Sequence, residues 1–143
     1  MASALCASPA YLEKAGVPQT LDDLQTHSCL RFASALFPSD RWTFTSSGET
    51  KDVDLPPDRL RVNSADALTI AVLEGLGIAP IPMLSALPYL ETGAIVRILP
   101  AWDLQPLSVF TLYASRQYLD AKIRTWIDFL KAFVHAKLSL DGP

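Results

Sequence analysis

Asn63 and Ser64 directly follow a short apolar run over 60–62 and precede a segment with helical spacing of apolar residues. Where a strand ends and a helix begins, unpaired backbone amides can bind an anionic or polar small molecule. Arg31 and Phe32 end another short run and could add a guanidinium and an aromatic wall. A plain N-cap at Ser64 and a solvated Arg31 explain the same residues without a ligand, so both interpretations stay open. The site hypothesis comprises Arg31, Phe32, Asn63 and Ser64.

Residues able to carry catalysis are few. The chain has two histidines, His27 and His135, and contains no Gly-x-Ser-x-Gly, His-Glu-x-x-His or paired Cys–His motif. Gly75 and Gly77 resemble the start of a dinucleotide-binding motif, but the third glycine is replaced by Pro80, and the two glycines close a helix instead of opening one. We therefore predict that the chain is not an enzyme and uses no cofactor.

The two cysteines predict buried thiols and no metal site. Cys6 and Cys29 lie in apolar runs without a second Cys or His at metal-ligand spacing.

The amino-terminal stretch reaches the charged residues Glu13 and Lys14 early, so no export signal is expected. The uncharged stretch 75–90 is too short for a membrane span and carries three prolines. These features favour a cytoplasmic protein that does not enter a membrane.

Composition predicts one folded domain, or one lobe of a larger one. The chain has 143 residues, of which 50% are hydrophobic and 19% are charged, and this excludes disorder as the main state. The net charge of −3 matches a polyanion poorly. We expect that this chain alone does not bind DNA.

Short strands and helices are expected to alternate and to position these residues. In chain order, the pattern predicts a strand over 3–7, helices over 9–16 and 20–27, a strand over 29–32, a hairpin that turns at 46–48, a strand over 60–62, a helix from 64 to 75, a strand over 78–82, a helix over 83–89, strands over 94–99 and 107–114, and a helix over 120–138. The Thr20 hydroxyl is expected to accept from the Asp23 amide at the start of its helix. The order strand, helix, strand, helix, strand after residue 60 predicts parallel units in a mixed sheet, with the proline-containing strand 78–82 at an edge or its prolines at a strand end.

The helix over 120–138 carries apolar side chains at spacings of three and four: Ile123, Trp126, Ile127, Leu130, Phe133 and Val134. A helix with such a face needs a surface to cover it.

The chain resembles the effector-binding domain of LysR-type transcriptional regulators. The resemblance is carried, in order, by Ala7-Ser-Pro-Ala-Tyr-Leu12, Asp23-Leu24, His27-Ser-Cys-Leu-Arg-Phe32, Trp42-x-Phe44, Gly48, Arg61-Val-Asn63, Ala67-Leu68, Glu74-Gly-Leu-Gly-Ile-Ala79, Pro82, Leu99-Pro-x-Trp102, Leu112-Tyr-Ala-Ser-Arg116 and Ile127-Asp-Phe-Leu130. No single motif is diagnostic, and the evidence is their order and spacing over nearly the whole chain.

The resemblance implies an α/β fold like the type II periplasmic binding proteins, with two lobes, crossing hinge strands and an effector in the cleft. On that plan, residues 1–7 are the first hinge strand, 8–106 the second lobe, and 107–143 the return hinge strand and the carboxyl-terminal helix of the first lobe. The implied effector pocket includes Arg31, Phe32, Asn63 and Ser64. The chemical identity of the effector does not follow from the resemblance.

A complete regulator of this type also has an amino-terminal winged helix-turn-helix and the first half of the first lobe, which we do not find before Met1. DNA is therefore expected to be contacted only through a domain absent from this chain. The helix face around Trp126 and Leu130 is expected either to pack against a second copy, as in a dimer, or to be rearranged. The alternative function is a free-standing solute-binding protein of the same fold, which an export signal would distinguish. An enzyme on this scaffold would need turnover that depends on Cys6, His27 or His135.

Overall fold

The computed structural model describes residues 3–33, 40–57, 59–104 and 121–139. The chain divides into two compact units, Ala2–Leu107 and Ser108–Pro143. The second unit contributes one described element, helix α4 (Ala121–Ser139). No helix in the described ranges is both long enough and apolar enough to span a membrane. The strand expected over 107–114 lies outside the described residues.

The larger unit is built from short elements that alternate along the chain. They are β1 (Ser3–Ala7), α1 (Pro9–Ala15), the 3-10 helix η1 (Asp22–Thr26), β2 (Arg31–Phe32), β3 (Arg41–Ser46), β4 (Glu49–Asp54), β5 (Arg61–Val62), α2 (Ala65–Leu73), β6 (Ala79–Pro82), α3 (Met83–Glu91), β7 (Val96–Arg97) and β8 (Asp103–Leu104). The strands and helices expected in these regions are present, although 22–26 forms a 3-10 helix and several strands are shorter than the sequence suggests. Strand β8 is not among the expected elements.

Strand β1 lies at the centre of the unit, between β6 and β7, and is antiparallel to both. Because both neighbours run opposite to β1, β6 and β7 run in the same direction, and α3 connects them. The segment that ends in β2 forms a parallel bridge from Cys29 to Ile78 and pairs in parallel with β5. The expected mixed sheet and its parallel strand–helix–strand units are confirmed. Among the described residues, β6 is the end strand of the sheet β6-β1-β7, and pairing on its other side is limited to Ile78, just before its prolines.

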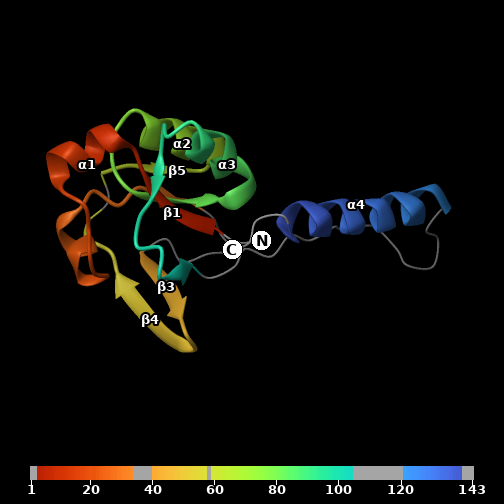
Figure 1. Ribbon diagram of the computed structural model, residues 1–143, viewed down its shortest axis with the longest axis horizontal. Helices are drawn as coiled ribbons and strands as arrows, with labels where there is room; N and C mark the ends of the chain where they lie inside the picture. Colours follow the sequence, from red (N-terminus) through yellow and green to blue (C-terminus); the bar gives the residue numbers. More distant parts are fainter. Residues whose placement is uncertain (1–2, 34–39, 58, 105–120, 140–143) are drawn as a thin grey trace. The chain divides into compact units, whose positions relative to one another are not determined.

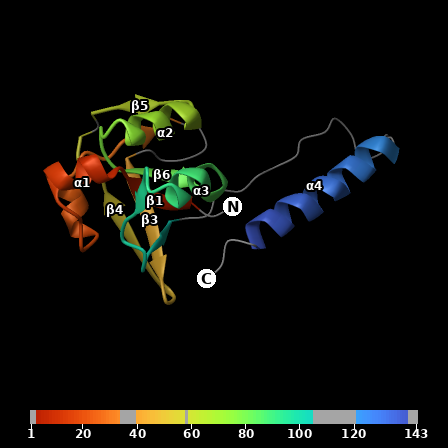
Figure 2. The same cartoon turned by 45° about the horizontal axis from the view of Figure 1, so that its top comes forward.

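The core lies on both faces of β1. On one face, Ala4 and Cys6 belong to a cluster that α2 and α3 cover. On the other face, Leu5 and Ala7 belong to a cluster that includes Phe44 of the hairpin. Figure 1 shows α2 and α3 on one side of β1 and the hairpin β3–β4 on the other, and Figure 2 shows the same arrangement after rotation. Burial on two faces explains why all five residues of β1 are buried.

Local turn chemistry fixes the hairpin and the end of α2. Ser47 and Gly48 both have positive φ, at 49° and 84°, as a two-residue turn between twisted strands requires. After α2, Gly75 takes a φ of 74°, and the amide of Leu76 donates to the carbonyl of Ala71 at 3.0 Å. This geometry ends a helix, which confirms the interpretation of Gly75 as a helix stop.

The expected cap at Thr20 is wrong in its direction. The Asp23 carboxylate accepts hydrogen bonds from the amides of Gln19 at 2.8 Å and Thr20 at 2.9 Å. These bonds hold the pKa of the Asp23 carboxyl below its usual range. The segment forms a five-residue 3-10 helix, and a charged oxygen reaches the preceding amides as a stronger acceptor than a hydroxyl.

Candidate functional site

Two strand ends meet at one edge of the larger unit. Strands β2 and β5 are parallel, with Phe32 opposite Val62, so their carboxyl ends lie at the same edge. Asn63 and Ser64 follow β5 directly and are exposed. The Ser64 hydroxyl accepts from the amide of Ala67 at 3.4 Å and so caps α2. The structure therefore brings Phe32, Asn63 and Ser64 to one edge, beside the amino-terminal end of α2.

Arg31 is positioned differently from its neighbour Phe32. Successive residues of a strand point to opposite faces, and Phe32 packs against the cluster beneath α2. The guanidinium of Arg31 is buried and donates to the carboxylate of Asp40 and to the carbonyl of Pro56. The same Asp40 oxygen accepts from Arg61 at 2.8 Å. Arg31 thus belongs to an ion-pair network that joins β2, β5 and the start of the hairpin.

The electrostatics of the edge favour a neutral polar group or a single negative charge. The amino-terminal end of α2 carries the positive end of the helix dipole. Asp66 lies in the first turn and is exposed, so its carboxylate opposes a second negative charge nearby. This arrangement can hold a polar ligand by hydrogen bonds, and the residues described at this edge include no nucleophile aligned with a base.

His27, one of the two histidines considered as a possible general base, is buried. His27 is 7% exposed, and its Nδ1 lies 3.0 Å from the hydroxyl of Tyr11. Burial lowers the pKa of its imidazole below the ordinary value, while the nearby Asp23 carboxylate opposes this shift. The side chain of His135 lies outside the described part of the chain. His27 is therefore placed for a structural role.

Both thiols are inert in this environment. Cys6 and Cys29 are buried and free, and burial raises the pKa of each thiol to about 12. Arg97 near Cys6 and Arg31 near Cys29 oppose that shift only in part. Within the described ranges, no cluster of three or more His, Cys, Asp or Glu could hold a metal ion.

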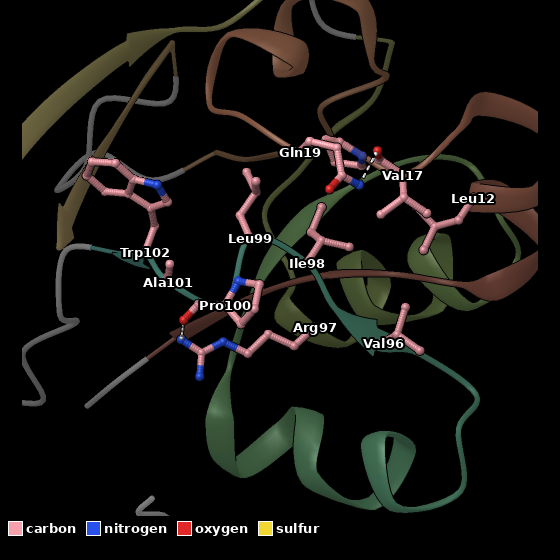
Figure 3. A pocket seen from close by; sticks show the side chains of 11 residues that line it. Leu12, Val17, Gln19, Val96, Arg97, Ile98, Leu99, Pro100, Ala101 and Trp102 are labelled. Carbon is pink, nitrogen blue, oxygen red and sulfur yellow. Dashed lines mark hydrogen bonds between the residues drawn. The ribbon is translucent and has the colours of Figure 1, made fainter.

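A groove that the sequence did not point to lies elsewhere in the larger unit. Its volume is about 330 Å³, and it is lined by Leu12, by 17–19 and by 96–102. Figure 3 shows mostly apolar side chains around it, with the Arg97 guanidinium turned back to the carbonyl of Pro100. None of its lining residues belongs to β2, β5 or α2, so this groove is separate from the edge at Asn63.

Comparison with known proteins agrees with this geometry. The family model described as "LysR substrate binding domain" matches residues 3–134. The chain belongs to the LysR substrate-binding domain family. The resemblance noted in the sequence is thereby confirmed, as is the α/β fold.

Relatives of this LysR-family domain include regulators of known name. The chain is 34% identical over 136 residues to the probable HTH-type transcriptional regulator LtrA of Klebsiella pneumoniae, covering 92% of this chain and 43% of LtrA. It is 32% identical over 134 residues to the HTH-type transcriptional activator TtdR of Escherichia coli K12, covering 94% of this chain and 43% of TtdR. The chain thus spans less than half the length of these relatives, which are transcriptional regulators and not enzymes.

Solved structures of the LysR family share this fold. The regulatory domain of AphB from Vibrio vulnificus is 32% identical with a TM-score of 0.70, and the match covers 92% of this chain and 64% of that domain. Full-length AphB of Vibrio cholerae, a virulence activator, is 29% identical with a TM-score of 0.75, and the match covers 92% of this chain and 44% of AphB.

Proposed function

We propose that this LysR-family chain senses a small-molecule effector for a transcriptional regulator. The family match over residues 3–134 carries the proposal. The edge where Asn63 and Ser64 leave β5 beside an exposed helix start supports it, because such edges bind ligands in α/β sheets. The ligand expected there is a small polar or aromatic molecule with at most one negative charge near Asp66.

Four residues are proposed to act on the effector. Asn63 and Ser64 offer hydrogen bonds at the exposed edge, and Phe32 offers apolar surface. Arg31 offers positive charge, because its partner Asp40 is 72% exposed and can exchange with a ligand carboxylate. In the proposed domain plan, residues 1–7 and the start of 107–143 are hinge strands, residues 8–106 are one lobe, and the remaining helix belongs to the other lobe.

The proposed mechanism is a shift between conformations without chemistry. An effector that binds one lobe arrangement more tightly shifts the population towards it and changes the geometry passed to a DNA-binding part. The relatives are HTH-type regulators of more than twice this chain's matched length. We assign DNA contact to a helix-turn-helix part outside these residues, and we place the regulator in the cytoplasm, where it meets DNA.

Helix α4 is proposed to take part in self-association. Its Trp126 is 56% exposed, and Phe129 and Phe133 stack on each other with centroids 5.9 Å apart. A single helix cannot bury such side chains by itself. We propose that the face around Trp126 and Leu130 packs against a second copy. Light scattering that gives a dimer for the wild type and a monomer for Trp126→Asp supports this assignment, and a monomeric wild type contradicts it.

A ligand screen with matched variants tests the effector site. Succinate, benzoate and other small carboxylic and aromatic acids are added to the chain, and backbone NMR shifts are followed. A binding acid is expected to move the Asn63, Ser64 and Ala67 amides first, and Asn63→Ala is expected to weaken binding about tenfold, the effect of losing one hydrogen bond to a charged group. Thr50→Ala, an exposed substitution on the hairpin, serves as the control and should leave binding unchanged. A hit whose shifts map to the groove at 96–102 would refute the site.

The alternative of a free-standing solute-binding protein receives no support from the relatives, which are transcriptional regulators.

A further inference from the structure

A buried tyrosine joins helix α1 to the segment that follows η1. The hydroxyl of Tyr11, on α1, lies 2.9 Å from the amide nitrogen of Ser28 and 3.0 Å from Nδ1 of His27. Because the Ser28 amide can only donate, the tyrosine oxygen accepts from it. The tyrosine proton is then free to point at His27. We call Tyr11, His27 and Ser28 the Tyr11 junction.

A hydrogen bond donated by Tyr11 to Nδ1 requires a neutral histidine. If the tyrosine donates to Nδ1, then Nδ1 carries no proton and the imidazole proton lies on Nε2. A second proton on the ring would turn Nδ1 into a donor aimed at the same hydroxyl. The tyrosine proton would then lose Nδ1 of His27 as its acceptor. Both side chains are buried, Tyr11 at 8% exposed and His27 at 7%. A buried polar group that loses its partner destabilises the conformation that buries it.

Charged groups around the junction do not cancel this effect. Asp23, on η1, favours the protonated ring, yet its oxygen already accepts from two backbone amides. Arg59, in the loop before β5, places a positive charge near Tyr11, and this charge disfavours a second positive charge on the His27 ring. Cys29, which also acts on Tyr11, keeps its proton because burial raises its pKa to about 12. Burial dominates at His27, whose pKa lies below its ordinary value of 6.5.

The junction also holds the start of the segment that runs from Ser28 into β2. The carbonyl of Ser28 accepts from the amide of Ile78 at 2.8 Å, and the amide of Leu30 donates back to Ile78 at 2.8 Å. The same segment continues into Arg31 and Phe32 of β2. Loss of the hydrogen bond from the Ser28 amide to the Tyr11 hydroxyl therefore loosens the attachment of this segment to α1, just before β2 begins.

We propose that the Tyr11 junction is a proton-sensitive switch, in which protonation of His27 at Nδ1 turns the Tyr11 hydroxyl away, releases the Ser28 amide and detaches the start of the segment that leads to β2 from α1. The junction is closed at neutral pH, when the His27 ring is neutral. An open conformation binds a proton on His27 more readily than the closed one, so the open conformation gains population as the pH falls. This switch does not depend on any effector. It adds acid as a second signal to the lobe that carries Arg31 and Phe32.

The test is NMR on the full chain. Substitution His135→Gln leaves His27 as the sole histidine, so its ring nitrogens can be followed without overlap. The ring is expected to be neutral with its proton on Nε2 and to titrate with a midpoint below 6.5, the ordinary value. Between about pH 7.5 and pH 5, the exchange protection of the Ser28 amide, corrected for the intrinsic rate, should fall about tenfold, as expected for loss of one buried hydrogen bond. The amide of Ile98, bonded to the Leu5 carbonyl at 2.9 Å, is the internal control and should keep its protection.

Two variants separate proton binding from general acid destabilisation. In His27→Gln the side-chain oxygen can still accept from Tyr11 but cannot become charged, so the protection of Ser28 should not change with pH. In Tyr11→Phe the protection should already be low at neutral pH. A midpoint at or above 6.5, a Ser28 protection that does not fall in the wild type, or an equal fall in His27→Gln would each overturn the switch. If His27→Gln does not fold, the titration and the exchange of the wild-type ring and amide decide the question alone.

Discussion

Gly77→Ala should destabilise the larger unit more than Gly93→Ala does. Gly77 is buried where the loop after α2 crosses the Ser28 segment. A Cβ at this position would lie 2.2 Å from the carbonyl oxygen of Ser28 and 3.1 Å from Cδ2 of Leu30. The first of these atoms belongs to the backbone, so it cannot rotate away. The loop that contains Gly77 and the segment that contains Ser28 would therefore have to move apart.

Separation costs free energy in two ways. Overpacking of a filled region costs typically 1–3 kcal/mol. Each weakened hydrogen bond between Ile78 and its partners Ser28 and Leu30 adds about 1 kcal/mol. We therefore expect Gly77→Ala to lower the free energy of unfolding by about 3 kcal/mol or more. With a typical slope of about 1–3 kcal/mol per molar urea, the midpoint of urea unfolding should move down by at least roughly 1 M.

Gly93→Ala supplies the matched control. Gly93 has a φ of 71° with no atom within 4 Å of a Cβ, so its exchange carries only the conformational cost of a left-handed residue, about 1–2 kcal/mol. Both variants are compared by urea unfolding followed by circular dichroism. The reasoning about Gly77 is refuted if its variant loses no more stability than Gly93→Ala.

Three further outcomes follow from the contacts around the core. Cys6 and Cys29 should react with a thiol reagent at pH 8 only after unfolding, since burial raises both thiol pKa values to about 12, and fast labelling of the native chain would contradict this. Arg31→Ala should cost about 2 kcal/mol in urea unfolding, because it removes the hydrogen bonds of a buried guanidinium, whereas Arg41→Ala removes an exposed ion pair and should leave the midpoint unchanged. Ser64→Ala should cost about 1 kcal/mol through loss of the α2 cap, and Ser64→Asp should restore it; equal losses in both variants would exclude the cap as the cause.

The sequence predicts those features that depend on near neighbours. Ser64 caps α2 through an amide three residues away, and Ser47 with Gly48 turns the hairpin through its own backbone conformation. Both are visible in a short window of sequence because the interacting atoms lie in that window. The order of strands and helices after residue 60 is predictable for the same reason, since each crossover helix joins strands that follow one another.

Contacts between distant segments could not be predicted in the same way. The insertion of β1 between β6 and β7 depends on pairing across most of the chain. Arg31 resembles a ligand-binding residue in sequence, yet its burial with Asp40 depends on the position of the hairpin. His27 resembles a base until Tyr11, 16 residues earlier, is placed beside it. The polarity of a side chain predicts that it needs a partner and does not predict which one.

The central position of β1 affects how the chain is synthesised. Cys6 pairs with Ala79 and Arg97, so the strand leaves the ribosome about 70–90 residues before its partners exist. At 5–20 residues per second, this wait lasts roughly 4–18 s. During that time, an apolar strand with two unpaired edges is exposed in the nascent chain and is open to pairing with other chains. Both edges of β1 can be paired only after residue 97 has been synthesised, so this strand is the part of the larger unit that waits longest for its partners.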